Sequence, residues 1–203
     1  MQICDIINMF KRFGGGNMFY ITECDSPFGK LTLASDGENL VGLWLEEQKY
    51  HGASILNGSQ KKDDVPVFDM AKKWLKKYFA GENPDASKLP LKPIGGDFRQ
   101  EVWNILNQIQ YGKVVTYGDI AKKIAVKMGK KKMSAQAVGG AVGHNPISII
   151  IPCHRVIGSN GNLTGYAGGI DIKIKLLKLE GVDMSGFSLP KKCSTVTLHL
   201  QKL

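Results

Sequence analysis

The stretch GENPDASKLPLKPIGG, residues 81–96, divides the 203-residue chain into halves with different hydrophobic patterns. It is rich in proline and glycine, as linkers between domains often are. Before it, apolar and polar residues alternate as in β-strands, and after it apolar residues recur at helical spacing. The change in period predicts an α+β protein with two domains joined by this linker.

The first half predicts a small antiparallel sheet and one helix, in a domain of residues 18–80. Strand-like segments FYITE, KLTLAS and LVGLWLE occur within residues 19–46 and are separated by turns. Residues 51–66 are polar and predict a loop. Apolar residues from Phe68 to Phe79 then recur at helical spacing, and the lysines between them fit a solvated helix face.

The second half, residues 97–190, predicts a mainly helical, winged-helix-like domain. Two short helices that begin near Thr116 and Ser134, joined by the basic turn KMGKKK, fit a helix-turn-helix. The apolar run at residues 147–151 predicts a buried strand. The remaining ends of the chain, 1–17 and 191–203, are interpreted as a flexible leader and an unpatterned tail.

Charge is distributed unevenly between these halves. The chain has 27 basic and 18 acidic side chains, a net charge of +9. Residues 1–96 hold 12 of each sign, whereas residues 97–203 hold 15 basic and 6 acidic residues. The imbalance predicts that a polyanion binds the second half. No apolar run approaches the roughly 18 residues of a membrane helix, so we expect no membrane partner.

The cysteine pattern predicts free thiols. No CxxC pair and no zinc-like spacing connects the four cysteines Cys4, Cys24, Cys153 and Cys193. The first residues do not have the charge order of a signal peptide. We therefore expect a cytoplasmic protein with no metal and no cofactor.

The string IPCHRV, residues 151–156, is the segment most suggestive of chemistry. A cysteine beside His154 and Arg155 is in a setting that favours the thiolate, and Pro152 fixes the chain before it. The alternative is that Cys153 is a small buried apolar residue. The two basic neighbours favour the reactive thiol.

Several motifs around this string occur together in a characteristic order. They are TYGDIA at 116–121, AVGGAVGHNP at 137–146, PCHRV at 152–156, GYAGG at 165–169 and LEG at 179–181. With them, the chain resembles the O6-alkylguanine-DNA alkyltransferases, also called methylated-DNA–protein-cysteine methyltransferases. The segment SPFGKLTLA, residues 26–34, resembles the ribonuclease-H-like first domain of that family.

The resemblance implies irreversible transfer of an alkyl group from O6-alkylguanine in DNA to Cys153, once per molecule, and leaves open whether O4-alkylthymine is also a substrate. His154 would act as the base through a water molecule, and Glu180 would orient it. Tyr117 would share its proton with the leaving guanine. Asn145 would form a hinge and hydrogen-bond near the thiol.

The resemblance also implies that a monomer binds double-stranded DNA through the minor groove and flips the lesion out of the stack. The implied DNA-binding residues are Ser134, Ala135, Gln136, Ala137, Gly139 and Gly140. The implied pocket residues are Tyr166, Ala167, Gly168, Pro152 and Ser148. Close helix packing is the alternative reason for the paired glycines.

Three departures from the family pattern bear on these expectations. Gln136 stands where many members have arginine, which predicts weaker affinity for duplex DNA. Ala167 stands where others have serine, which removes one hydroxyl. Zinc ligands found in the first domain of some members are not matched, in line with the expectation of no metal.

Two other functions were weighed against alkyl transfer. A non-catalytic protein that binds alkylated lesions would lack the cysteine, which is present here as Cys153. A cysteine hydrolase could use Cys153 and His154. The basic second half, the helix-turn-helix and the missing downstream His/Asn partners argue against a hydrolase.

Overall fold

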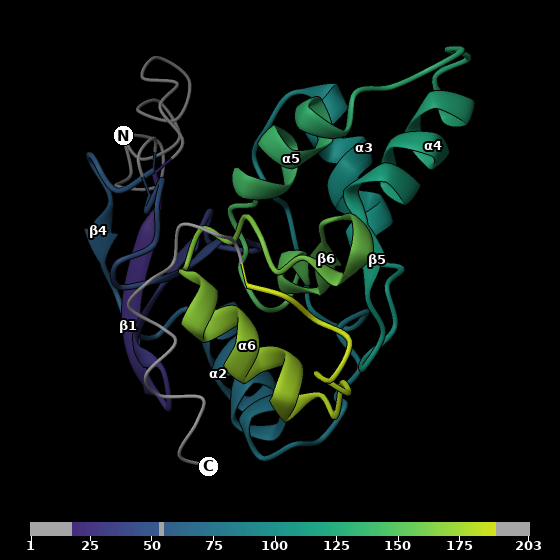
Figure 1. Ribbon diagram of the computed structural model, residues 1–203. Coiled ribbons are helices and arrows are strands. Elements are labelled where there is room, and N and C mark those ends of the chain that lie inside the picture. Colours follow the sequence, from purple (N-terminus) through teal and green to yellow (C-terminus); the bar gives the residue numbers. More distant parts are fainter. Residues whose placement is uncertain (1–17, 53–54, 190–203) are drawn as a thin grey trace, which may run out of the picture.

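The computed structural model describes residues 18–52 and 55–189. The predicted leader 1–17 and tail 191–203 lie outside these residues, as do Cys4 and Cys193. The predicted α+β fold is confirmed: a small sheet with one helix is followed by a mainly helical part (Figure 1). No helix in the described part of the chain is long and apolar enough to cross a membrane.

The sheet is built on the predicted meander. Strands β1 (Tyr20–Ser26), β2 (Gly29–Ser35) and β3 (Leu40–Leu45) pair antiparallel in chain order. A two-residue strand, β4 (Gln60–Lys61), pairs parallel with β1 and completes the order β3-β2-β1-β4. The prediction of a loop over residues 51–66 missed β4, which is too short and too polar to show a period.

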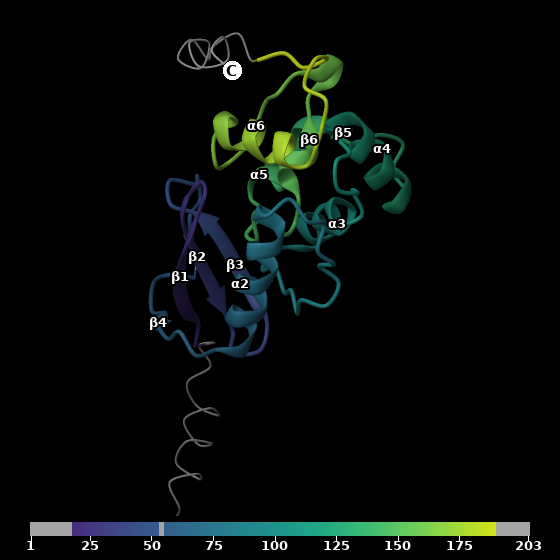
Figure 2. The same ribbon diagram turned by 90° about the horizontal axis from the view of Figure 1, so that it is seen from below.

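Alternation along the strands separates two apolar faces. Leu31, Leu33, Leu43 and Leu45 belong to the main core, together with helix α2 (Pro66–Phe79). Figure 2 shows α2 lying along the sheet, on the side nearer the helical part. The other face carries a smaller cluster that includes Trp44. One face of the sheet therefore supports both α2 and the second half of the chain.

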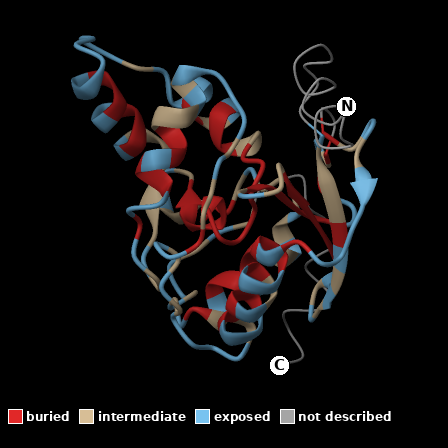
Figure 3. Ribbon diagram, turned by 180° about the vertical axis from the view of Figure 1, so that it is seen from behind, coloured by how far each residue is buried: buried red, intermediate tan, exposed pale blue. Residues whose placement is uncertain are grey.

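The second half contains the predicted pair of helices. Helices α3 (Asp97–Leu106), α4 (Tyr117–Lys127) and α5 (Ala135–Gly143) pack on one another, and α6 (Ile170–Leu179) follows later. A reciprocal capping box of Thr116 and Asp119 begins α4, and the Ser134 hydroxyl caps α5. In Figure 3 the buried segments of both parts meet in the middle of the molecule, where one continuous core joins them.

A short parallel ladder brings distant segments together. Strands β5 (Val115–Thr116) and β6 (Val156–Ile157) pair in parallel. The first strand runs directly into α4 at Tyr117, and the second follows Cys153 by three residues. The ladder therefore places the start of α4 beside the turn that carries Cys153.

The predicted strand at residues 147–151 is wrong. The segment is a buried series of turns in which Ile149 has a φ of +69°, a left-handed conformation that a β-branched residue rarely adopts. The Leu43 N–H donates to Pro146 and the Leu43 carbonyl accepts from Ser148, at 2.8 Å each. Residues 147–151 are apolar and buried and form hydrogen bonds with β3. Their composition is therefore the same as that of a short buried strand, and the sequence pattern alone does not reveal the turns.

Gly42 of β3 allows the indole of Trp44 to cover the outer face of the sheet. A Cβ at residue 42 would lie 1.9 Å from the nearest Trp44 ring atom. We expect Gly42→Ala to lower the free energy of unfolding by roughly 1–3 kcal/mol, because the buried ring must be displaced. Urea denaturation measures this loss. Gly186→Ala is the matched control, since a Cβ there meets nothing within 4 Å; equal losses in both variants would contradict the packing argument.

Candidate active site around Cys153

Two tight turns place Cys153 at the start of a one-turn 3₁₀ helix, η1 (Cys153–Arg155). The Ile150 N–H bonds back to the Ser148 carbonyl across Ile149, and the Cys153 N–H bonds back to the Ile151 carbonyl across Pro152, each at 2.8 Å. Pro152 has φ −82° and ψ +63°, the values of an inverse γ-turn. Consecutive turns of this kind leave the sulfur little positional freedom, and Cys153 is only 3% exposed.

Asn145 also holds the sulfur of Cys153 in place. Its Nδ2 donates to Sγ of Cys153 at 3.1 Å and to the Ile151 carbonyl at 2.8 Å. Its Oδ1 accepts from the Ile147 N–H at 3.0 Å. A buried amide with both ends occupied cannot rotate without losing hydrogen bonds. Asn145 therefore ties the turn of residues 147–151 to the thiol, and the hinge role that the resemblance implies for it stays a prediction.

Burial of Cys153 favours the protonated form of its thiol. Burial raises the pKa of Cys153, and this effect outweighs the hydrogen bond from Asn145 and the charge of Lys173, which lower it. The sequence expectation that neighbouring His154 and Arg155 favour the thiolate is therefore wrong for the resting site. The Arg155 guanidinium faces Glu180 rather than the sulfur.

The carboxylate of Glu180, at the C-terminal end of α6, is the centre of a buried hydrogen-bond network. Oε1 accepts from the Tyr78 hydroxyl at 2.6 Å, from His154 Nε2 at 2.7 Å and from Arg155 Nη2 at 3.0 Å. Oε2 accepts from Arg155 Nε at 2.8 Å and from the Gly112 N–H at 3.2 Å. The side chains of Glu180 and His154 are both fully buried.

This network sets the protonation of the His154 ring. Burial lowers the pKa of His154 below its ordinary 6.5, against the opposing effect of Glu180. Burial alone would raise the pKa of Glu180, but hydrogen bonds and charge from His154 and Arg155 bring it down to about 2. An ionised carboxylate only accepts, so Nε2 of the neutral ring carries the proton. His154 Nδ1 is then a buried acceptor, and it has no partner among the described residues.

Tyr78 is a member of this network that sequence reasoning missed. It lies on the apolar stripe of α2, in the first half of the chain, where it is indistinguishable from a core residue. Its ring is fully buried and stacks on Trp74 at a centroid distance of 5.2 Å. Its hydroxyl gives the Glu180 carboxylate a donor that comes from the other half of the chain.

Lys173 of α6 was also missed. Its ammonium group is buried and donates to the carbonyls of Val156 and Thr164 at 2.6 and 2.8 Å. Burial lowers its pKa to about 8, against the effect of Cys153. A signal was present, because Lys173, Leu177 and Glu180 recur at helical spacing and share one face of α6. A lysine on the apolar face of a helix is a stronger candidate for a functional residue than a lysine on a solvated face.

Two tyrosines flank the thiol. The hydroxyl of Tyr117 donates to the Gly165 carbonyl at 2.9 Å, so its proton is engaged by the backbone. The Tyr166 hydroxyl is buried and has no partner among the described residues. Burial raises the pKa of both phenols, and the charge of an ionised Cys153 adds to the effect in each.

A cavity of about 340 Å³ opens between α5 and the loop after Thr164. Of the predicted pocket residues, Tyr166 and Ala167 line it, whereas Gly168, Ser148 and Pro152 do not. The Ser148 hydroxyl donates to the Gln48 side chain. Pro152 lines a larger cavity of about 610 Å³, together with Tyr78 and Arg155. In residues 18–52 and 55–189, no group of three or more His, Cys, Asp and Glu could hold a metal ion.

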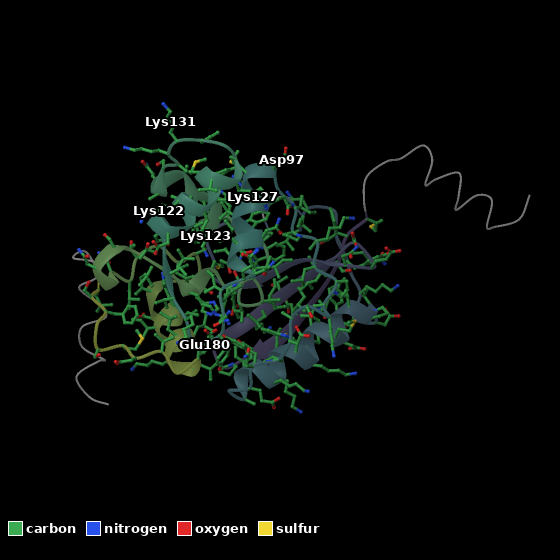
Figure 4. All side chains as sticks on the ribbon, turned by 90° about the vertical axis from the view of Figure 1, so that its right-hand side faces the viewer. Asp97, Lys122, Lys123, Lys127, Lys131 and Glu180 are labelled. Carbon is green, nitrogen blue, oxygen red and sulfur yellow. The ribbon has the colours of Figure 1, made fainter. Side chains whose placement is uncertain are left out.

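The predicted DNA-binding residues lie at the start and along one side of α5. All are exposed except Gly139, which is half-buried. A Cβ at Gly139 would make only ordinary contact with Tyr117, and one at Gly140 would meet nothing within 4 Å. Tight helix packing therefore does not explain the paired glycines. Exposed lysines of α4 and of the following loop lie nearby, and Figure 4 shows Lys131 at the outer tip of this loop.

Comparison with known proteins identifies the family. The model of the 6-O-methylguanine DNA methyltransferase ribonuclease-like domain matches residues 19–93, and that of the 6-O-methylguanine DNA methyltransferase DNA binding domain matches residues 97–182. The chain belongs to this methyltransferase family. The resemblance drawn from the sequence motifs is thereby confirmed.

Individual relatives agree over most of their length. A methylated-DNA–protein-cysteine methyltransferase of Haemophilus influenzae is 42% identical over 163 residues, which are 80% of this chain and 87% of the relative. One from Methanosarcina acetivorans is 46% identical over 170 residues, 80% of this chain and 98% of the relative. A crystal structure of Mycobacterium tuberculosis OGT in complex with DNA has 43% identity and a TM-score of 0.67, covering 80% of this chain and 92% of that one.

The Glu180 network predicts acid sensitivity. The pKa of Glu180 is about 2 in the folded chain against an ordinary 4.5, so its stabilisation is complete above pH 4.5 and is lost as the pH falls toward 2. We expect Glu180→Gln to cost about 3 kcal/mol of unfolding free energy at pH 7, and less at pH 3. Urea denaturation at both pH values measures this.

The control is Glu82→Gln, which changes an exposed carboxylate and is expected to alter stability by less than about 0.5 kcal/mol. A Glu180→Gln deficit that was the same at pH 7 and pH 3 would contradict the charge-based account.

Proposed function

We propose that this chain repairs DNA by moving the alkyl group of O6-alkylguanine onto its own Cys153, once per molecule. The observation that carries the proposal is the thiol itself. It is held by Asn145 at 3.1 Å, lies next to the His154–Glu180 pair, and sits in a chain that matches methylated-DNA–protein-cysteine methyltransferases over most of their length.

The first event is removal of the thiol proton. Nδ1 of neutral His154 is the available acceptor, and it takes the proton through a water molecule, since the two side chains are neighbours in sequence. The imidazolium that forms is stabilised by the ionised carboxylate of Glu180. The new thiolate is stabilised by the Asn145 amide and by the charge of Lys173, both of which lower the pKa of Cys153.

The sulfur then displaces guanine from the alkyl carbon. One S–C bond forms and the C–O6 bond breaks, and its electron pair stays on the guanine oxygen. Tyr117 donates a proton to the departing base, which makes it a better leaving group. The hydroxyl of Tyr117 must leave the Gly165 carbonyl to do so. A thioether has no easy reverse step, so each molecule acts once.

DNA reaches the site through α5. We propose that its small, exposed side chains enter the minor groove and that the lesion flips into the cavity beside Tyr166. Gln136 fills the gap that the base leaves, and the lysines after α4 bind phosphates. The monomeric state stays a prediction from the resemblance. The cytoplasmic location stays a prediction from the cysteine pattern.

Cys153→Ala tests the central claim. We expect the wild-type protein to gain the mass of one alkyl group when incubated with O6-alkylguanine DNA, and the variant to gain none, because in the part of the chain that the structure describes only Cys153 combines a thiol with the adjacent His154–Glu180 pair. Intact mass spectrometry measures this, and a gel-shift assay measures DNA binding. The variant should retain DNA affinity within about threefold of the wild-type value, since Cys153 is buried away from α5's exposed face.

Cys24→Ala is the control, because Cys24 is also a free thiol but lies in β1. Alkylation of the Cys153→Ala variant, or equal loss of alkylation in the Cys24→Ala control, would refute the assignment.

The pH dependence tests the role of His154. The pKa of His154 lies below 6.5, so the ring stays neutral and basic down to that pH. We expect the alkylation rate constant with free O6-benzylguanine to stay nearly flat from pH 8 to 6.5 and to fall at lower pH. A thiol that ionised without a base would instead slow about tenfold for each pH unit below its raised pKa. Such a slope between pH 8 and 6.5 would exclude His154 as the base.

A further inference from the structure

The cavity beside Tyr166 is lined partly by the first half of the chain. Lys49 and Tyr50, in the loop that follows β3, form part of its wall. Hydrogen bonds tie this loop to the catalytic part. The Ser148 hydroxyl donates to Gln48 Oε1 at 2.8 Å, and the Lys49 N–H donates to the Ala167 carbonyl at 3.0 Å. The position of Tyr50 is therefore set by segments that flank the thiol.

Tyr50 is held in a costly arrangement. Its φ is +64°, and the residue is 46% exposed although it carries a large aromatic side chain. A non-glycine residue in this conformation costs of the order of 1–3 kcal/mol and persists where its surroundings impose it, often at functional sites. Neither the conformation nor the exposure serves the core. Both are explained if the Tyr50 ring has a function in the wall of the cavity.

The ring of Tyr50 stacks on the imidazole of His144. The centroids are 4.0 Å apart and the planes 19° apart. The imidazole is oriented by its Nδ1, which lies 2.7 Å from the Gly140 carbonyl and donates to it. His144 directly precedes Asn145, whose amide touches the sulfur. His144 of the stacked pair is therefore one residue along the chain from the side chain that holds the sulfur.

The other walls of the cavity are nearly bare. Along α5 they are Gly139, Gly140 and Gly143, and in the opposite loop Gly165 and Ala167. Of the lining residues, the large side chains are Lys49, Tyr50, His144 and Tyr166. A buried polar group, the Tyr166 hydroxyl, is available to the purine. The Tyr50–His144 pair instead offers flat aromatic faces, which suit an apolar substituent.

We propose that the Tyr50–His144 pair is the wall that limits the size of the O6-alkyl group this protein accepts. The proposal rests on the proposed function, and it names the specificity element of that same site. Because Tyr50 comes from the first half of the chain, this half restricts the substrates of a reaction whose nucleophile and base lie in the second half.

The test compares two free bases, O6-methylguanine and O6-benzylguanine, so that DNA binding does not enter. The rate of mass gain on Cys153 is measured for each base, and the benzyl-to-methyl ratio is the readout. Tyr50→Ala and Tyr50→Gly remove the ring, and glycine also relieves the strained backbone. We expect both to raise the ratio by about tenfold or more, the low end of what a methylene-sized change in a hydrophobic pocket gives.

Tyr50→Phe keeps the ring and should retain the wild-type ratio. Met70→Ala, an exposed apolar residue on α2, is the control for truncation of a surface side chain and should also leave it unchanged. A ratio within twofold of wild type in both ring-removing variants would overturn the proposal. So would a loss of duplex-DNA affinity at an unchanged ratio, because Tyr50 would then be a DNA contact.

Failure of the proposed function gives a different result. A wild-type protein that gains no mass from either base or from O6-methylguanine DNA would refute alkyl transfer itself. A wild-type protein that is alkylated normally, with Tyr50 variants that do not change the ratio, would refute only the size limit.

Discussion

The carboxylate of Glu180 is the interaction on which the rest of the site depends. Five hydrogen bonds converge on its two oxygens, from α2, from η1 and from the loop before β5. An ionised carboxylate at the C-terminal end of a helix is disfavoured by the helix dipole, and burial adds a desolvation cost. The donors offset both costs. Removing one donor would leave the buried charge of Glu180 poorly compensated. The positions of His154 and Arg155 therefore depend on how α2, η1 and the loop before β5 pack together.

The first half of the chain is thereby part of the site rather than a separate support. Tyr78 donates to Glu180 from α2, Leu43 of β3 hydrogen-bonds both sides of the turn at residues 146–148, and Gln48 accepts from Ser148. Gly168 lets the two halves approach, because a Cβ there would lie 2.6 Å from Leu45. These contacts hold Ile149 in its unfavourable backbone conformation, which a free loop would relax.

The sequence predicted the elements better than it predicted the contacts between them. Periodicity located the meander, α2 and the two helices of the helix-turn-helix, because each has a clear apolar stripe or alternation. The family resemblance assigned Asn145, His154 and Glu180 to the site, and the structure places Asn145 in contact with Cys153 and His154 in contact with Glu180. Residues 147–151 were predicted to form a strand because their composition is apolar. An apolar composition reports that a segment is buried, and it does not report that the backbone forms turns. Tyr78 and Tyr50 could not be found, because a hydroxyl on a core stripe and a tyrosine in a polar loop carry no local signal.

The raised pKa of Cys153 has a chemical consequence. Oxidants and adventitious electrophiles react with thiolates, so a buried cysteine whose pKa is raised is protected from both. A protein that acts once per molecule loses its function permanently by any side reaction of that sulfur. In the proposed mechanism, the Asn145 amide and the Lys173 charge stabilise the thiolate once His154 has taken the proton. The low exposure of Cys153, 3%, further limits which molecules can contact the sulfur.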